Sequence, residues 1–245
     1  MTIVAAIKCT NGIALASDSR LTVHGFAQQL GQKIHLLPGP QFFAFAGDLG
    51  LAERFRAIAE QLGPQIKEHP HKLQYALTIA NNMIGNLQLT GVDHGAADLA
   101  TFLAFISNDS PEVCLFEKGS QPRFLDNHHF AVTTGSGSVA SSPFIKFLID
   151  ILLCGRQPTI AEGRLLAIWA VDYSINTMSG TVGKPIDMAT IELCQSGEWA
   201  FKEHDQDSVQ ETLQAIQSAC DSLRQWRSDL EEPTATEPVP KPPRQ

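Results

Sequence analysis

The first twenty residues predict a pair of β-strands joined by a tight turn. Two short apolar runs, Ile3–Ile7 and Ile13–Ala16, flank the dipeptide Asn11-Gly12. Asn-Gly is typical of hairpin turns because both residues tolerate positive φ. We therefore expect strands at about residues 2–8 and 12–19, the second ending in Asp-Ser-Arg.

The remaining apolar pattern alternates between blocks of short strands and pairs of helices. Apolar residues recur at helical spacing from Leu49 to Leu62, whereas short apolar runs bounded by turn residues predict strands. Further strands are expected at 33–37, 42–46, 99–106, 113–116, 124–125, 130–134, 187–194 and 198–202. Helices are expected at 49–62, 73–87, 142–154, 159–176 and 206–229.

This order of elements predicts an α+β fold rather than a doubly wound sheet, which would alternate strand and helix regularly. The economical solution is a four-layer αββα sandwich, in which two largely antiparallel sheets stack face to face and a helix pair covers each outer face. Such stacking explains strands that are apolar on both faces. We expect one domain over residues 1–204, a C-terminal helix over 205–230 and a disordered Pro-rich tail over 231–245.

Composition excludes several classes of function. The 245 residues carry a net charge of −8 and no cluster of Lys and Arg interleaved with aromatic residues, so nucleic acid is not an expected partner. The five cysteines are widely spaced, and the pair His128-His129 has no further ligand at metal spacing, so we expect no metal and no cofactor. There is no stretch long and apolar enough for a membrane span and no signal peptide at the start, so we expect a cytoplasmic protein.

Three polar residues suggest a catalytic corner. A hairpin of strands 2–8 and 12–19 brings Asp18 opposite the chain start, and the strand that begins at Lys33 can lie beside them in the same sheet. If Met1 is removed, the α-amine of Thr2 can act as the base for the Thr2 hydroxyl. An ammonium nearby lowers the pKa of that amine, and Asp18 would keep Lys33 charged and in place.

These residues stand in a pattern that resembles the proteasome β-type subunits of the N-terminal-nucleophile hydrolases. The resemblance runs from Thr2 to about Leu193 and is carried by T-I-V-A-A-I-K-x-x-x-G-I-A-L-A-S-D-S-R, K-I-H-L-L and A-F-A-G-D. The spacing from Thr2 to Lys33 and the segment T-V-G-K-P-I-D at 181–187 are most similar to the bacterial ancestral-β-subunit type. The αββα sandwich is also what this resemblance implies.

The resemblance implies roles for particular residues. Thr2 would be the nucleophile, Lys33 the catalytic lysine, and Gly47 the oxyanion donor through its backbone amide. The remaining catalytic positions that it implies are Asp18, Arg20 and Ser136. The positions around the first specificity pocket are Leu21, Gly31, His35, Phe45, Leu49 and Glu53. The residues that complete the site stay open among Asp172, Ser174, Asn176 and Ser179.

The function expected from this resemblance is that of a threonine-type endopeptidase. It would act on peptides or unfolded proteins within a homo-oligomer, as a ring or a spiral, and the sequence leaves open whether an ATPase partner exists. Two alternatives remain. One is an inactive proteasome-like scaffold subunit, although an α-type subunit would carry a helix before the first strand. The other is an N-terminal-nucleophile amidase that acts on a small amide.

Overall fold

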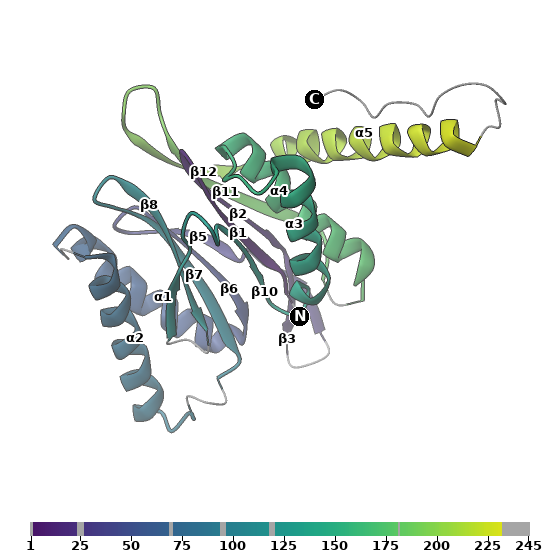
Figure 1. Ribbon diagram of the computed structural model, residues 1–245. Coiled ribbons are helices and arrows are strands. Elements are labelled where there is room, and N and C mark those ends of the chain that lie inside the picture. Colours follow the sequence, from purple (N-terminus) through teal and green to yellow (C-terminus); the bar gives the residue numbers. More distant parts are fainter. Residues whose placement is uncertain are drawn as a thin grey trace.

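Two five-stranded antiparallel sheets form the centre of the molecule (Figure 1). The computed structural model describes residues 2–23, 27–68, 71–93, 97–117, 121–180 and 182–231. The first sheet has the order β10 (Ala131–Thr134), β1 (Val4–Cys9), β2 (Gly12–Asp18), β11 (Ile186–Leu193), β12 (Trp199–His204). The second has the order β5 (Ile34–Leu37), β6 (Gln41–Gly47), β7 (Leu99–Ser107), β8 (Ser110–Glu117), β9 (Gln121–Phe124).

A helix pair covers the outer face of each sheet, which gives the predicted four layers (Figure 1). On the second sheet the pair is α1 (Leu49–Leu62) and α2 (Lys72–Leu89), joined by the 3-10 helix Gly63–Glu68. On the first sheet it is α3 (Ser138–Leu153) and α4 (Ile160–Thr177). The last helix, α5 (Gln206–Glu231), begins against α4 and β11 and then extends away from the sandwich.

Alternation along β1 explains why this strand is apolar throughout. Successive side chains of a strand point to opposite faces of its sheet. Ile3, Ala5 and Ile7 pack with α3 and α4, whereas Val4 and Ala6 pack in the core between the two sheets. A third apolar cluster lies between the second sheet and the α1–α2 pair. The predicted αββα architecture is confirmed.

A buried ion pair crosses between the sheets at the end of β1 that lies away from Thr2. Lys8 Nζ of the first sheet lies 2.9 Å from Glu112 Oε2 of the second. Lys72 Nζ, at the start of α2, lies 2.9 Å from the other carboxylate oxygen. The side chains of Lys8 and Glu112 are 10% and 7% exposed. The two sheets are therefore joined there by a charged contact as well as by apolar packing.

The structure differs from the sequence-based predictions after Asp18 and at Lys33. A small hairpin of β3 (Arg20–Val23) and β4 (Ala27–Leu30) follows Asp18, where no strands were predicted. The prediction that Lys33 belongs to the same sheet as Thr2 and Asp18 is wrong, because Lys33 leads into β5 of the second sheet. The predicted disordered tail lies outside the described residues, apart from Glu231, which ends α5.

Candidate active site

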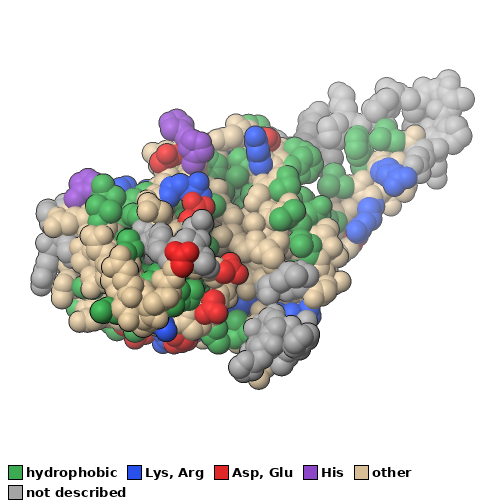
Figure 2. Space-filling view, turned by 90° about the horizontal axis from the view of Figure 1, so that it is seen from below, with side chains coloured by type: hydrophobic (Ala, Val, Ile, Leu, Met, Phe, Trp, Pro, Cys, Tyr) green, Lys and Arg blue, Asp and Glu red, His purple; other side chains and the backbone are tan. Residues whose placement is uncertain are grey.

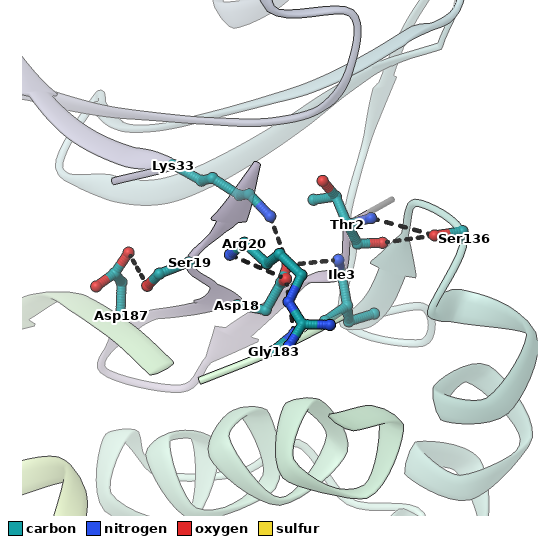
Figure 3. A network of polar contacts seen from close by, with 9 residues as sticks. All are labelled: Thr2, Ile3, Asp18, Ser19, Arg20, Lys33, Ser136, Gly183 and Asp187. Carbon is teal, nitrogen blue, oxygen red and sulfur yellow. Dashed lines mark hydrogen bonds and ion pairs between the residues drawn. The ribbon is translucent and has the colours of Figure 1, made fainter. Parts of the chain in front are cut away.

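Asp18 occupies the last position of β2 and is the centre of a buried polar network (Figure 3). Its Oδ1 accepts hydrogen bonds from the backbone N–H of Ile3, at 2.9 Å, and from Lys33 Nζ, at 2.7 Å. Its Oδ2 accepts from the backbone N–H groups of Arg20, at 3.3 Å, and of Gly183, at 3.2 Å. Both carboxylate oxygens are therefore satisfied, as a buried carboxylate requires.

Lys33 reaches this network from the opposite sheet. The side chains of Lys33 and Asp18 are both 0% exposed. Burial lowers the pKa of the Lys33 ammonium, and the charge of Arg20 lowers it further, while Asp18 acts in the opposite direction. The effect of burial on the pKa of Lys33 is larger than that of the Asp18 carboxylate. Asp18 therefore holds Lys33 in position but does not restore its ordinary pKa.

A second carboxylate, Asp187, also borders Lys33, and no role for it was predicted from the sequence. Ser19 Oγ donates to Asp187 Oδ2 at 2.9 Å, and the backbone N–H of Lys33 donates to the same carboxylate. Burial raises the pKa of Asp187, because it disfavours the charged form. The signal in the sequence was weak: Asp187 ends the segment 181–187 that resembled the bacterial type.

Thr2 is held against the loop that precedes α3 (Figure 3). The Thr2 nitrogen donates to Ser136 Oγ at 3.1 Å, and the Gly137 N–H donates to the Thr2 carbonyl oxygen at 3.1 Å. Gly135 has φ +90°, and a Cβ on it would lie 2.2 Å from the Thr2 carbonyl oxygen. A side chain at position 135 would therefore displace Thr2. Thr2 itself is 7% exposed.

Thr2 lines a cleft of about 960 Å³ together with Gly47. Gly47 ends β6 with φ +122°, and a Cβ on it would lie 2.1 Å from the carbonyl oxygen of Asp98. Glycine is thus required where the second sheet meets the cleft. Among the predicted pocket residues, Leu21 and Leu49 line the same cleft.

The other predicted pocket residues are not among those that line this cleft. Phe45 is buried in the core beneath α1, where its ring stacks on Phe43. The ring of His35 also lies against Phe43, and burial lowers the pKa of its imidazole. Glu53 is exposed on α1, and its charge raises the pKa of His35. Gly31 packs close to Leu21, since a Cβ on it would lie 2.3 Å from Leu21 Cδ1.

Of the four residues left open for completing the site, the two serines contact residues of the site, whereas the other two contact each other. Ser174 is buried, and its hydroxyl donates to the Gly137 carbonyl at 3.1 Å, so it supports the loop that holds Thr2. The Ser179 carbonyl accepts from Arg20 Nη1 at 2.8 Å. The other two, Asp172 and Asn176, bond to each other on α4.

Solved structures described as Anbu resemble this chain over nearly its whole length. The match to a mutant described as Anbu (Gly-1), from Hyphomicrobium sp. strain MC1, has a TM-score of 0.73 and covers 95% of this chain and 99% of that one. Anbu (ancestral beta-subunit) from Yersinia bercovieri matches with a TM-score of 0.68 and covers 98% of this chain and 99% of the other. The chain has the Anbu fold.

Sequence similarity to these Anbu structures is low. The identities are 18% and 15%, and a further Anbu structure from Hyphomicrobium sp. strain MC1 matches at 17% identity, with a TM-score of 0.71 over 94% of this chain and 98% of that one. No protein-family model and no curated protein matches the sequence. The similarity to Anbu therefore establishes the fold and its resemblance to the ancestral bacterial β-subunit type, and leaves the activity to be argued from the site.

The described residues hold neither a metal-binding cluster nor a membrane-spanning helix. Within the described ranges, there is no group of three or more His, Cys, Asp and Glu side chains that could hold a metal ion, and the expectation of a metal-free, cofactor-free site stays a prediction. Among the described helices, none has the length and apolar character needed to cross a membrane.

Proposed function

We propose that this chain is a threonine-type endopeptidase that acts in the cytoplasm within a homo-oligomer of Anbu-like subunits. Removal of Met1 would free the α-amine of Thr2, and the Thr2 hydroxyl would then attack a peptide carbonyl. The amine takes the hydroxyl proton and later delivers it to the leaving amine, as a general base and then a general acid. Attack forms an acyl bond to Thr2 Oγ1, the peptide C–N bond breaks, and water hydrolyses the acyl bond.

The observation that carries this proposal is the buried ion pair next to the start of β1. Asp18 binds the backbone N–H of Ile3, the residue after Thr2, and the Lys33 ammonium through the same carboxylate oxygen. A buried ion pair has a large desolvation cost and is weak evidence for stability alone. Its place beside a hydroxyl residue that lines a cleft favours a catalytic role for Lys33.

The charges around Thr2 suit an amine that must be neutral to accept a proton. An α-amine has an ordinary pKa of about 7.7–8.0. Proximity of the Lys33 and Arg20 cations would lower this pKa, because like charge disfavours the protonated form. Ser136 Oγ, 3.1 Å from the Thr2 nitrogen, orients the amine.

Gly47 is the proposed oxyanion donor. It lines the cleft with Thr2, and its positive φ at the end of β6 requires the residue to be glycine. A single oxyanion donor contributes about 3–4 kcal/mol to the stability of the transition state in measured cases. Leu21 and Leu49 provide apolar surface in the same cleft for a substrate side chain. Peptides and unfolded proteins are therefore the proposed substrates.

The test combines mass spectrometry with peptide hydrolysis. The mass of the purified native protein should show that Met1 is absent, since an acylated Thr2 nitrogen cannot serve as the base. Thr2→Ala should abolish peptide hydrolysis while the oligomer still assembles, and Thr2→Ser should retain activity because it keeps both the hydroxyl and the amine. Retention of Met1 in active protein would refute the mechanism.

The same experiment separates the two alternatives. A scaffold subunit would assemble equally well with Thr2 or Ala at position 2 and would hydrolyse nothing. An amidase would cleave small amides in a Thr2-dependent manner but leave peptides intact. The proposal requires Thr2-dependent cleavage of a peptide bond.

A further inference from the structure

The charged side chains that line the cleft next to Thr2 are all acidic within the described part of the chain. They are Asp98, just before β7, and Glu117, at the end of β8. The remaining lining residues are neutral, and neither Lys33 nor Arg20 is among them. The end of the sandwich that holds Thr2 is turned toward the viewer in Figure 2, where Asp and Glu side chains gather near the middle of the face.

We infer that the cleft selects peptides that carry a Lys or Arg side chain close to the bond that is cut. This inference rests on the proposed function, because it concerns the substrate that the Thr2 hydroxyl would attack. A carboxylate near the surface attracts a cation and repels an anion, and such contacts give specificity more than affinity. The size of the cleft supports substrate binding independently of its charge. Its volume of about 960 Å³ is at the upper end of the usual range for a ligand site.

The lining suits the shape of a basic side chain as well as its charge. Leu21, Leu49 and Leu99 contribute apolar surface to the cleft. Lys and Arg bury their methylene stems along apolar surface while the charged head stays near water. Asp98 is exposed, and its backbone carbonyl accepts the Asp48 N–H at 2.8 Å, which fixes the main chain from which this carboxylate projects.

Glu117 remains available to a substrate cation. Among the described residues its ionic partner is Arg123, at 3.9 Å, and both side chains are more than half exposed. Exposed pairs of this kind contribute little to stability and are easily exchanged. A substrate ammonium or guanidinium can therefore replace Arg123 as the partner of Glu117.

The test uses three hexapeptides of Ala and Leu that are identical except for one position next to the scissile bond, where they carry Lys, Gln or Glu. We expect kcat/KM to fall in the order Lys, Gln, Glu, with roughly three- to tenfold between the extremes, as two partly screened charges allow. Raising NaCl from about 50 to about 500 mM should reduce this ratio, because exposed charges are screened. Equal kcat/KM for the Lys and Glu peptides would overturn the inference.

Matched variants separate the cleft from the net charge of the protein. Asp98→Asn with Glu117→Gln should bring the Lys-to-Glu ratio of kcat/KM close to one, because the described lining of the cleft then carries no charge that distinguishes the two peptides. Glu211→Gln, on the exposed surface of α5, removes a charge elsewhere and should leave the ratio unchanged. A ratio that persists in the double variant would show that the two carboxylates do not select the substrate.

A binding measurement keeps the inference testable if no peptide is hydrolysed. Fluorescein-labelled forms of the same three peptides are titrated into Thr2→Ala protein, and anisotropy reports their Kd values. Tighter binding of the Lys peptide, lost in Thr2→Ala protein that also carries both carboxylate substitutions, supports a basic-peptide cleft even where the peptidase proposal has failed. Equal binding of all three peptides would overturn the selectivity, whatever the outcome for catalysis.

Discussion

In Asp18→Asn, an NH₂ group replaces one of the two carboxylate oxygens that accept hydrogen bonds at the centre of the described site. The carboxylate accepts four hydrogen bonds, two through Oδ1 and two through Oδ2. Asparagine has one carbonyl oxygen and one NH₂ group. If the oxygen stays toward Ile3 and Lys33, the NH₂ group faces the N–H groups of Arg20 and Gly183, and two donors lose their acceptor.

The expected cost follows from these contacts. Removing one partner of a buried ion pair leaves an uncompensated charge and typically costs about 3–5 kcal/mol. The loss of counter-charge also lowers the pKa of Lys33 further, so the ammonium deprotonates more readily and part of this cost is relieved. We expect Asp18→Asn to lower the free energy of unfolding by about 3 kcal/mol at neutral pH, and to abolish hydrolysis because Lys33 loses its counter-charge.

Urea denaturation followed by circular dichroism measures this change. The control is Asp126→Asn, which changes an exposed carboxylate whose Oδ1 accepts backbone N–H groups at 2.7 and 2.6 Å, and it should lower stability much less than Asp18→Asn. Combining Asp18→Asn with Lys33→Met removes both charges, so its cost should be smaller than the sum of the two single costs. A loss below about 1 kcal/mol for Asp18→Asn, or strictly additive costs in the double variant, would refute this account of the pair.

Two other predictions follow from single residues. The ordinary pKa of histidine is 6.5, and burial lowers that of His204 to about 4, so the unfolded chain binds a proton here that the folded chain does not. Stability should therefore fall by about 1–3 kcal/mol as the pH drops from about 6.5 to about 4, and His204→Gln should flatten this part of a urea-midpoint profile; an unchanged profile would contradict the assignment. Gly135→Ala should reduce peptide hydrolysis at least tenfold, because its Cβ would strike the Thr2 carbonyl oxygen. Gly197 has a similar positive φ, but a Cβ on it would meet open space. Gly197→Ala should therefore lower stability without reducing hydrolysis, and equal losses of activity in Gly135→Ala and Gly197→Ala would contradict the steric argument.

The elements of the sandwich could be predicted because their signals are local. The helical spacing from Leu49 to Leu62 gave α1 with its observed ends, and the Asn11-Gly12 turn gave the β1–β2 hairpin. The β3–β4 hairpin was missed because its four-residue strands, RLTV and AQQL, are too short and polar to show an apolar alternation. The pairing of strands could not be predicted in this way, because no pattern within residues 33–37 indicates which sheet the strand joins.

The residues of the site could also be predicted only in part, because contacts between distant residues leave no local signal in the sequence. Thr2, Asp18 and Lys33 were selected from the sequence, and the structure brings Lys33 and Asp18 into contact although they arise from different sheets. Asp187 was missed because its contact with Ser19 and Lys33 joins residues about 150 or more positions apart. The catalytic and substrate-binding roles of these residues stay predictions until they are measured.

The two ion pairs that cross between the sheets have a consequence for how this protein can evolve. Lys33 with Asp18 and Lys8 with Glu112 connect the sheets at opposite ends of β1 and β2, and the apolar layer between them includes Ala44. Apolar packing has no preferred direction, whereas a hydrogen-bonded ion pair tolerates only small changes in separation. The thickness of the inner core therefore sets the reach of Lys33. An enlarged side chain at position 44 could impair the chemistry from within the core, so selection for activity would also constrain residues that never meet a substrate.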